Sequence, residues 1–431
     1  MSREENRKNF SKYVSQNILG MIGFSCYVLA DSYFISIAKG ADGLTALNLV
    51  MPLYSIIFSI GEMIGVGSAI RYAIGKIKKD ADADDYFWNA IIWCIISSMI
   101  FVFAGIFFSA DIMRILGADE HIVAVGNNYT KIFMCFAPMF MCNYVTNAFV
   151  RNDGAPGIAM SATLFSSLFN IVFDYILMFP MNLGMEGAAL ATALSPIIGM
   201  GICSIHFFSK KSRVRLVVCK PSVRKLVAGC QLGVSAFVGE MSSAVITLAF
   251  NFVILKLAGN VGVAAYGVVA NIAIVTTAVF NGVAQGSQPL ISSCFGRGDK
   301  DGCTQLKRMG YITAFILAAV MYSILFIFAG QLVAVFNSEG SEMLRLYATE
   351  GVKLYFIGIF FAGINIVGGG AFSATEDAFK AAVVSVARGF VLILGAVFVM
   401  SALFGMTGVW LAYAVAEGIT TFIMLVMVLR V

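Results

Sequence analysis

Long apolar runs, each long enough to cross a lipid bilayer, alternate along the chain with short polar stretches. A helix rises 1.5 Å per residue, so a hydrocarbon core about 30 Å thick needs roughly 20 apolar residues. The runs are continuous rather than alternating, which favours helices over a β-barrel. Cutting the chain where charged or turn residues interrupt them predicts twelve transmembrane helices. These cover residues 14–37, 45–70, 87–109, 123–149, 157–180, 184–208, 228–257, 261–290, 309–335, 347–373, 379–402 and 405–429.

The composition supports an integral membrane protein. The 431 residues are 59% hydrophobic and 12% charged, whereas about 25% of residues are charged in an average soluble domain. The apolar composition makes the lipid bilayer the expected surrounding. A net charge of +5 is too small to indicate a nucleic-acid partner. The nine cysteines lack metal-ligand spacing, and His121 and His206 are the only histidines. We therefore expect no enzyme, no cofactor and no metal site built on histidine or cysteine.

The basic residues predict the orientation. With the N-terminus inside, 22 of the 29 lysines and arginines fall on the cytoplasmic side, because short cytoplasmic loops retain them. Both termini are then cytoplasmic. The basic segment 209–227 falls between two sets of six predicted spans. It is interpreted as a linker between an N-terminal lobe, residues 1–208, and a C-terminal lobe, residues 228–431.

An internal repeat relates the two lobes. Shifting the sequence by 219 places residues 40–68 over 259–287 without a gap, and a shift of 221 places GMEGAALATA at 184 over GMTGVWLAYA at 405. Each copy holds six spans, an even number, so both enter the membrane in the same direction. The sequence thus predicts an all-α membrane protein with two pseudo-symmetric six-helix lobes, as parallel repeats, around a central cleft. This architecture is typical of transporters.

Charged side chains at membrane depth mark functional candidates, because burying them in lipid costs several kcal/mol unless they face a partner or a wet cavity. Asp31, Asn170, Asp174 and Thr192 are predicted at one level of the outer half of the first lobe, counted from the span ends. Asn170 and Asp174 share a helical face, being four residues apart. Together they offer oxygen ligands for a small cation, Na⁺ included, or a carboxylate pair that can share a proton.

Four further charged residues lie inside predicted spans. Glu62 and Glu240 are candidates to line the cleft and attract a cationic substrate, although a structural role for each is equally consistent with the sequence. Arg388 is expected to neutralise Glu417, since the eleventh and twelfth spans are neighbours. Five of the six intramembrane charges are acidic, which indicates a path for cations.

Four segments resemble the multidrug and toxic compound extrusion family of antiporters. They are LADSYFIS, NIVFDYILMFPMNLGMEGAALATALS, VAAYGVVANIAIV with NGVAQGSQPLIS, and FAGINIVGGGAFSATEDAF. The resemblance implies a V-shaped pair of lobes and a cation site at Asp31, Asn170, Asp174 and Thr192. It further implies a place in the inner membrane and export of bulky, often cationic, aromatic compounds. We expect the protein to be a monomer. Some members of that family have a proline in the first span, whereas residues 14–37 contain none, so a proline-kink mechanism is not carried over.

The sequence therefore predicts multidrug efflux by antiport with H⁺ or Na⁺, through alternating access. The alternative within transport is a flippase for lipid-linked cell-wall or polysaccharide precursors. Such a flippase would need intramembrane basic residues for its anionic substrate, and only Arg388 is available at membrane depth.

Overall fold

The computed structural model describes residues 3–336 and 341–429, and within these ranges the chain is almost entirely helical. Its α-helices are α1 Arg3–Lys78, α2 Asp85–Ile115, α3 Glu120–Cys135, α4 Ala137–Asn152, α5 Pro156–Met178, α6 Gly184–Phe207, α7 Val223–Gly296, α8 Lys300–Ile327, α9 Ala329–Phe336, α10 Glu342–Tyr355, α11 Ile359–Ala374, α12 Ala378–Val386 and α13 Leu392–Leu429. A short 3₁₀ turn, η1 Phe356–Gly358, joins α10 to α11, and a π-helical turn, η2 Ala387–Val391, joins α12 to α13.

These helices give twelve membrane spans in the described residues, as predicted. By length and composition nine helical stretches are long and apolar enough to cross a membrane, and the bent pair α3 and α4 makes ten. Two of these stretches, Val223–Gly296 and Ala378–Val428, each hold two helices that reverse at a glycine. The helix before Gly40 is continuous from Arg3, so the span without proline is not kinked.

Glycines at matching positions of the repeat close its helical hairpins. Gly40 and Gly259, which the shift of 219 superimposes, have φ of 58° and 60°, and Gly405 has φ of 58°. This left-handed conformation is accessible to glycine but costs other residues roughly 1–2 kcal/mol. A Cβ at any of the three would meet nothing within 4 Å, so the backbone conformation alone explains the glycines. The repeat in sequence is therefore also a repeat in backbone geometry.

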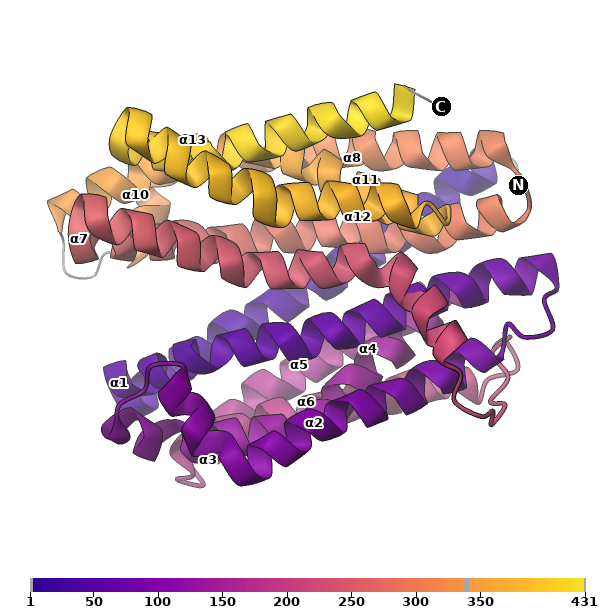
Figure 1. Cartoon of the computed structure of the whole chain (residues 1–431), viewed down its shortest axis with the longest axis horizontal. Helices are drawn as coiled ribbons and strands as arrows, with labels where there is room; N and C mark the ends of the chain where they lie inside the picture. The colour runs from indigo at the N-terminus through magenta and orange to yellow at the C-terminus, as the bar shows by residue number, and fades with distance from the viewer. Residues whose placement is uncertain (1–2, 337–340, 430–431) are drawn as a thin grey trace.

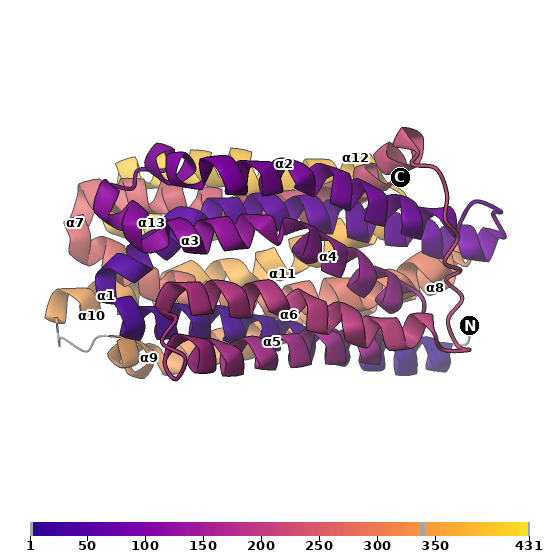
Figure 2. The same ribbon diagram turned by 90° about the horizontal axis from the view of Figure 1, so that it is seen from below.

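The helices form two bundles, α1–α6 and α7–α13, with separate cores (Figure 1). Figure 2, from below, shows α2 beside α3 and α5 beside α6, with α4 between these pairs. The beginning of α1 crosses this division, because Phe10 and Val14 pack into the C-terminal core. Helix α7 begins at Val223, so the last five residues of the predicted linker are helical.

The connection between α6 and α7 is tied to the first bundle by one buried carboxylate. Asp153 is 4% exposed and accepts hydrogen bonds from the Tyr72 hydroxyl, the backbone N–H of Arg213 and the Arg213 guanidinium. The ring of His206 also lies 2.8 Å from its second oxygen. We call this end of the molecule, which carries residues 208–222, the linker end. The opposite end, with Gly40, Gly259 and Gly405, is the turn end.

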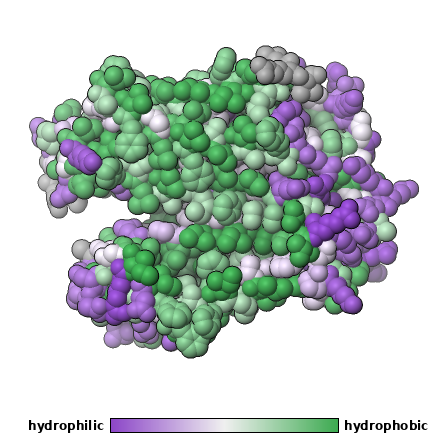
Figure 3. Space-filling view, in the orientation of Figure 1, coloured by the Kyte–Doolittle hydropathy of each residue, from purple (hydrophilic) through white to green (hydrophobic). Residues whose placement is uncertain are grey.

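The bundles meet at the linker end and separate towards the turn end, where Figure 3 shows a hollow between the two halves of the surface. At the linker end α7 lies directly against the second half of α1. A Cβ on Gly233 would lie 2.0 Å from the backbone oxygen of Met63, and one on Gly67 would lie 1.9 Å from that of Gly229. An ion pair of Arg71 with Glu376 also joins the bundles here. The structure is thus closed at one end and open at the other.

Candidate functional site

The four residues of the predicted cation site lie on three adjoining helices and are all buried. Helix α1 packs closely on α5: the ring of Phe34, three residues after Asp31, and that of Tyr175, next to Asp174, have centroids 6.2 Å apart. The exposed fractions are 5% for Asp31, 0% for Asn170 and Asp174, and 1% for Thr192. Asn170 and Asp174 fall on the buried face of α5, because they are one helical turn apart.

Hydrogen bonds connect three of these side chains. With its amide oriented to satisfy both neighbours, Asn170 donates to Oδ2 of Asp174 at 3.1 Å. In the same orientation its oxygen accepts from the hydroxyl of Thr192 at 3.1 Å and from its backbone N–H at 3.2 Å. The amide thus fixes one carboxylate oxygen and holds α5 against α6. Asparagine and threonine satisfy each other in this arrangement.

The two carboxylates each retain an oxygen without a partner. Oδ1 of Asp31 and Oδ1 of Asp174 are buried and form no hydrogen bond. The two carboxyl groups are also within electrostatic range of each other. Two buried carboxylates are costly when both are charged and unpaired, so the site favours uptake of a positive charge. Among the described residues there is no group of three or more His, Cys, Asp or Glu that could hold a metal ion.

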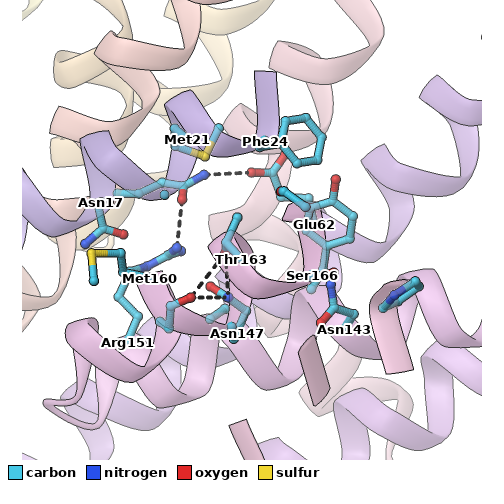
Figure 4. A pocket seen from close by; sticks show the side chains of 18 of the residues that line it. Asn17, Met21, Phe24, Glu62, Asn143, Asn147, Arg151, Met160, Thr163 and Ser166 are labelled. Carbon is cyan, nitrogen blue, oxygen red and sulfur yellow. Dashed lines mark hydrogen bonds between the residues drawn. The ribbon is translucent and has the colours of Figure 1, made fainter. Parts of the chain in front are cut away.

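A cavity that is open to solvent lies on the linker-end side of this cluster (Figure 4). Glu62 and Glu240 both line it, together with amide and aromatic side chains. Their binding of a cationic substrate stays a prediction. Within the described chain Glu240 has no hydrogen-bond or ion-pair partner. Its other lining side chains include Asn17, Phe24, Asn143, Asn147, Arg151 and Gln285.

Sequence reasoning missed two residues of this cavity. Arg151 follows the predicted span 123–149 and was counted with the cytoplasmic charges, yet it is 4% exposed and lines the cavity. Gln285 was not selected because it is uncharged. Arg151 Nη1 donates to Oε1 of Gln285 at 2.7 Å, and Gln285 Nε2 donates to Oε1 of Glu62 at 3.3 Å. A signal for Gln285 existed in the sequence, since a long polar side chain inside an apolar run needs a partner.

The remaining pair of intramembrane charges is structural, as expected. The Arg388 guanidinium donates to both oxygens of Glu417, with the shortest contact at 2.7 Å, so this prediction is confirmed. Asn365 donates to the second oxygen of Glu417 at 2.7 Å and anchors α11 to α13. Arg388 also lines a second cavity, which shares Glu62, Glu240 and Gln285 with the first.

Two helical bundles around a cavity with buried carboxylates define a multi-pass membrane transport protein. The family model MatE matches residues 17–176 and 236–399, one segment in each bundle. The chain therefore belongs to the MatE family of multidrug efflux transporters, which are not enzymes.

Relatives and solved structures agree with this assignment. The chain is 26% identical over 410 residues to the multidrug export protein MepA of Staphylococcus saprophyticus. It is 27% identical over 414 residues to MepA of Staphylococcus aureus; each alignment covers 93% of this chain and 89% of the relative. A structure described as the outward-facing conformation of a multidrug resistance MATE family transporter superimposes with a TM-score of 0.92 at 20% identity, covering 99% of this chain and 96% of that one. A transporter from Pyrococcus furiosus, titled as having a binding pocket of reverse polarity, gives 0.90 at 20% identity, covering 98% and 95%.

Proposed function

We propose that the protein exports drug-like organic cations across the cytoplasmic membrane by antiport with an inward-moving H⁺ or Na⁺. The observation that carries this proposal is the pair of unpartnered carboxylate oxygens on Asp31 and Asp174. A cation that binds them relieves a buried negative charge, and it therefore stabilises whichever conformation holds the pair buried. Relatives named as multidrug export proteins support the cargo class, whereas nothing in the comparisons supports a flippase.

The coupling is conformational and does not require the cation and the cargo to touch. The carboxylate pair lies on α1 and α5, and the cavity with Glu62 and Glu240 lies between the bundles. Each ligand needs only to favour a different arrangement of the bundles, because a ligand without such a preference shifts no equilibrium. One charge moving down about 100 mV releases about 2.3 kcal/mol, enough for roughly a 50-fold gradient of a neutral cargo. When the cargo is itself a monovalent cation and the exchange is one for one, no net charge crosses, so the concentration gradient of the coupling ion drives export.

The arrangement of oxygens around Asp31 and Asp174 bears on whether H⁺ or Na⁺ is the coupling ion. A proton needs one of the two unpartnered carboxylate oxygens. Sodium would need further oxygens: the amide oxygen of Asn170 already accepts from Thr192, whereas the Thr192 hydroxyl, which donates that bond, keeps its lone pairs for a cation. The distribution of basic residues supports cytoplasmic termini, which places the turn end outside and the cavity open to the exterior. Residues 1–2 and 430–431 lie outside the described part of the chain. We expect the monomer to be sufficient for transport.

The test uses purified protein in liposomes with a fluorescent aromatic cation and with pH and sodium gradients imposed separately. We expect the wild type to move the dye under one gradient, and Asp31→Asn with Asp174→Asn to abolish this movement. Asp301→Asn, at an exposed position of α8, is the matched control and keeps full activity. Gradient-driven export by the double variant would refute the assignment of the site. Dye movement under neither gradient would refute antiport.

A further inference from the structure

Gln285 is a neutral residue of the C-terminal bundle whose side chain reaches two charged residues of the N-terminal bundle. Its amide N–H donates to Glu62 at 3.3 Å, and its amide oxygen accepts from Arg151 at 2.7 Å. The bonds that end on Glu62 and on Arg151 are dashed in Figure 4. One carboxamide therefore bridges an acid and a base that are more than 4.0 Å apart and form no ion pair with each other.

Glu62 depends on this bond. It is 8% exposed, and no lysine, arginine or histidine of the described chain lies within ion-pair distance of it. Glu417, the other buried glutamate among the described residues, is instead paired with Arg388 and Asn365 inside its own bundle. A buried carboxylate with a single neutral donor remains short of positive charge. Glu62 is thus well suited to exchange its partner, and Glu417 is not.

The bond exists because the bundles touch at the linker end. Residues close to Glu62 on α1 form the tight contact with α7, through Met63 and Gly233. Gln285 lies on α7, in the C-terminal bundle, whereas Glu62 and Arg151 lie in the N-terminal bundle. Separating the bundles at this end would therefore withdraw Gln285 from both. Glu62 would then face a cavity open to the linker end with no donor from the opposite bundle.

We propose that Gln285 is a specificity-determining residue that competes with the cargo for Glu62 when the linker end is closed. The cargo it competes with carries a protonated amine, which takes the place of the amide N–H on the carboxylate. Glu62 then binds the amine tightly in the conformation open at the linker end and weakly in the conformation seen here. This inference rests on the proposed export function and adds the reason why cargo leaves at the turn end.

Export requires such a difference, because a cavity with equal affinity in both states would reload from the exterior. A hydrogen bond from a neutral amide to a carboxylate is strong enough to account for a difference of about tenfold. Substituting Gln285 by leucine removes both hydrogen-bonding atoms and nearly conserves volume. We expect the variant to bind cargo about tenfold more tightly from the turn-end side and equally well from the linker-end side.

The experiment uses everted membrane vesicles, in which the linker end faces the medium, and a fluorescent aromatic amine. KM is measured for dye added to the medium, and an inhibition constant for the same dye preloaded in the lumen. Gln285→Leu should lower the luminal inhibition constant about tenfold and change KM less than twofold. Gln288→Leu is the matched control one helical turn away, because Gln288 lines the second cavity and forms no bond with Glu62.

Two further measurements separate this role from a structural one. In a Glu62→Gln background, Gln285→Leu should leave the luminal inhibition constant unchanged. Gln285→Asn, which keeps the amide and shortens its reach, serves as the second variant if leucine impairs folding, and should act in the same direction. An equal change of both constants, or no change in either, would overturn the inference. Loss of gradient dependence in the wild type would instead overturn antiport and leave the comparison of the two constants interpretable.

Discussion

Closure of the linker end depends on a glycine that permits two helices to touch at their backbones. A Cβ on Gly233 would lie 2.0 Å from the backbone oxygen of Met63, whereas real Cβ atoms essentially never approach within 3.0 Å of another heavy atom. Gly233→Ala therefore forces α7 away from α1 by about 1 Å or more. Overpacking of this kind costs about 1–3 kcal/mol, and only the closed arrangement bears the cost. The ratio of linker-end-open to closed molecules should rise about 5- to 150-fold.

Spin labels report this shift directly. Labels at positions 82 and 301 lie on exposed sites of opposite bundles at the linker end, so their separation increases when that end opens. Pulsed electron resonance on protein in nanodiscs should show a larger long-distance population for Gly233→Ala than for the wild type. Gly239→Ala, on the same helix, is the control, because its Cβ would meet nothing within 4 Å. Identical distance distributions for both variants and the wild type would refute the reasoning.

Three further outcomes are expected. Asp153→Ala should lower the thermal unfolding midpoint in detergent far more than Asp301→Ala does. The reason is that removing one partner from a buried charged network costs about 3–5 kcal/mol. Equal midpoints for the two variants would contradict this. Arg71→Glu should increase the linker-end-open population in the same spin-label assay, and adding Glu376→Arg should restore the closed population. A double variant that stays as open as Arg71→Glu would show that this ion pair does not hold the two bundles together. Gly405→Ala should destabilise the protein by about 1–2 kcal/mol through its positive φ alone, and unchanged stability in urea would argue against that strain.

The spans and their pairing into hairpins were accessible from the sequence. Helices in lipid need long apolar runs, and each run satisfies its own backbone hydrogen bonds, so the information is local. The repeat likewise identified Gly40 and Gly259 as equivalent before their shared φ was known. The Arg388–Glu417 pair was predicted for a similar reason, because consecutive spans are neighbours and both side chains were expected near mid-depth.

The candidate cation site was partly accessible. Counting residues from the span ends placed Asp31, Asn170, Asp174 and Thr192 at one depth, but depth does not specify which way a side chain points around its helix. The hydrogen bonds from Asn170 to Asp174 and Thr192 depend on how α5 and α6 pack. The role of these residues in cation binding stays a prediction until the transport assay is done.

The contacts between bundles were decided by the tertiary structure alone. Arg151 was expected at the membrane edge, and it lies in the cavity because α4 continues to Asn152 beside the meeting point of the two bundles. Gln285 carries no charge, and its place in the segment NGVAQGSQPLIS does not say what it contacts; it matters because the closed linker end brings it to Glu62. The pattern of apolar residues along the chain predicts which side chains are removed from water. The relative rotation and tilt of two bundles is set instead by many weak contacts between residues distant in sequence, and no local pattern encodes it.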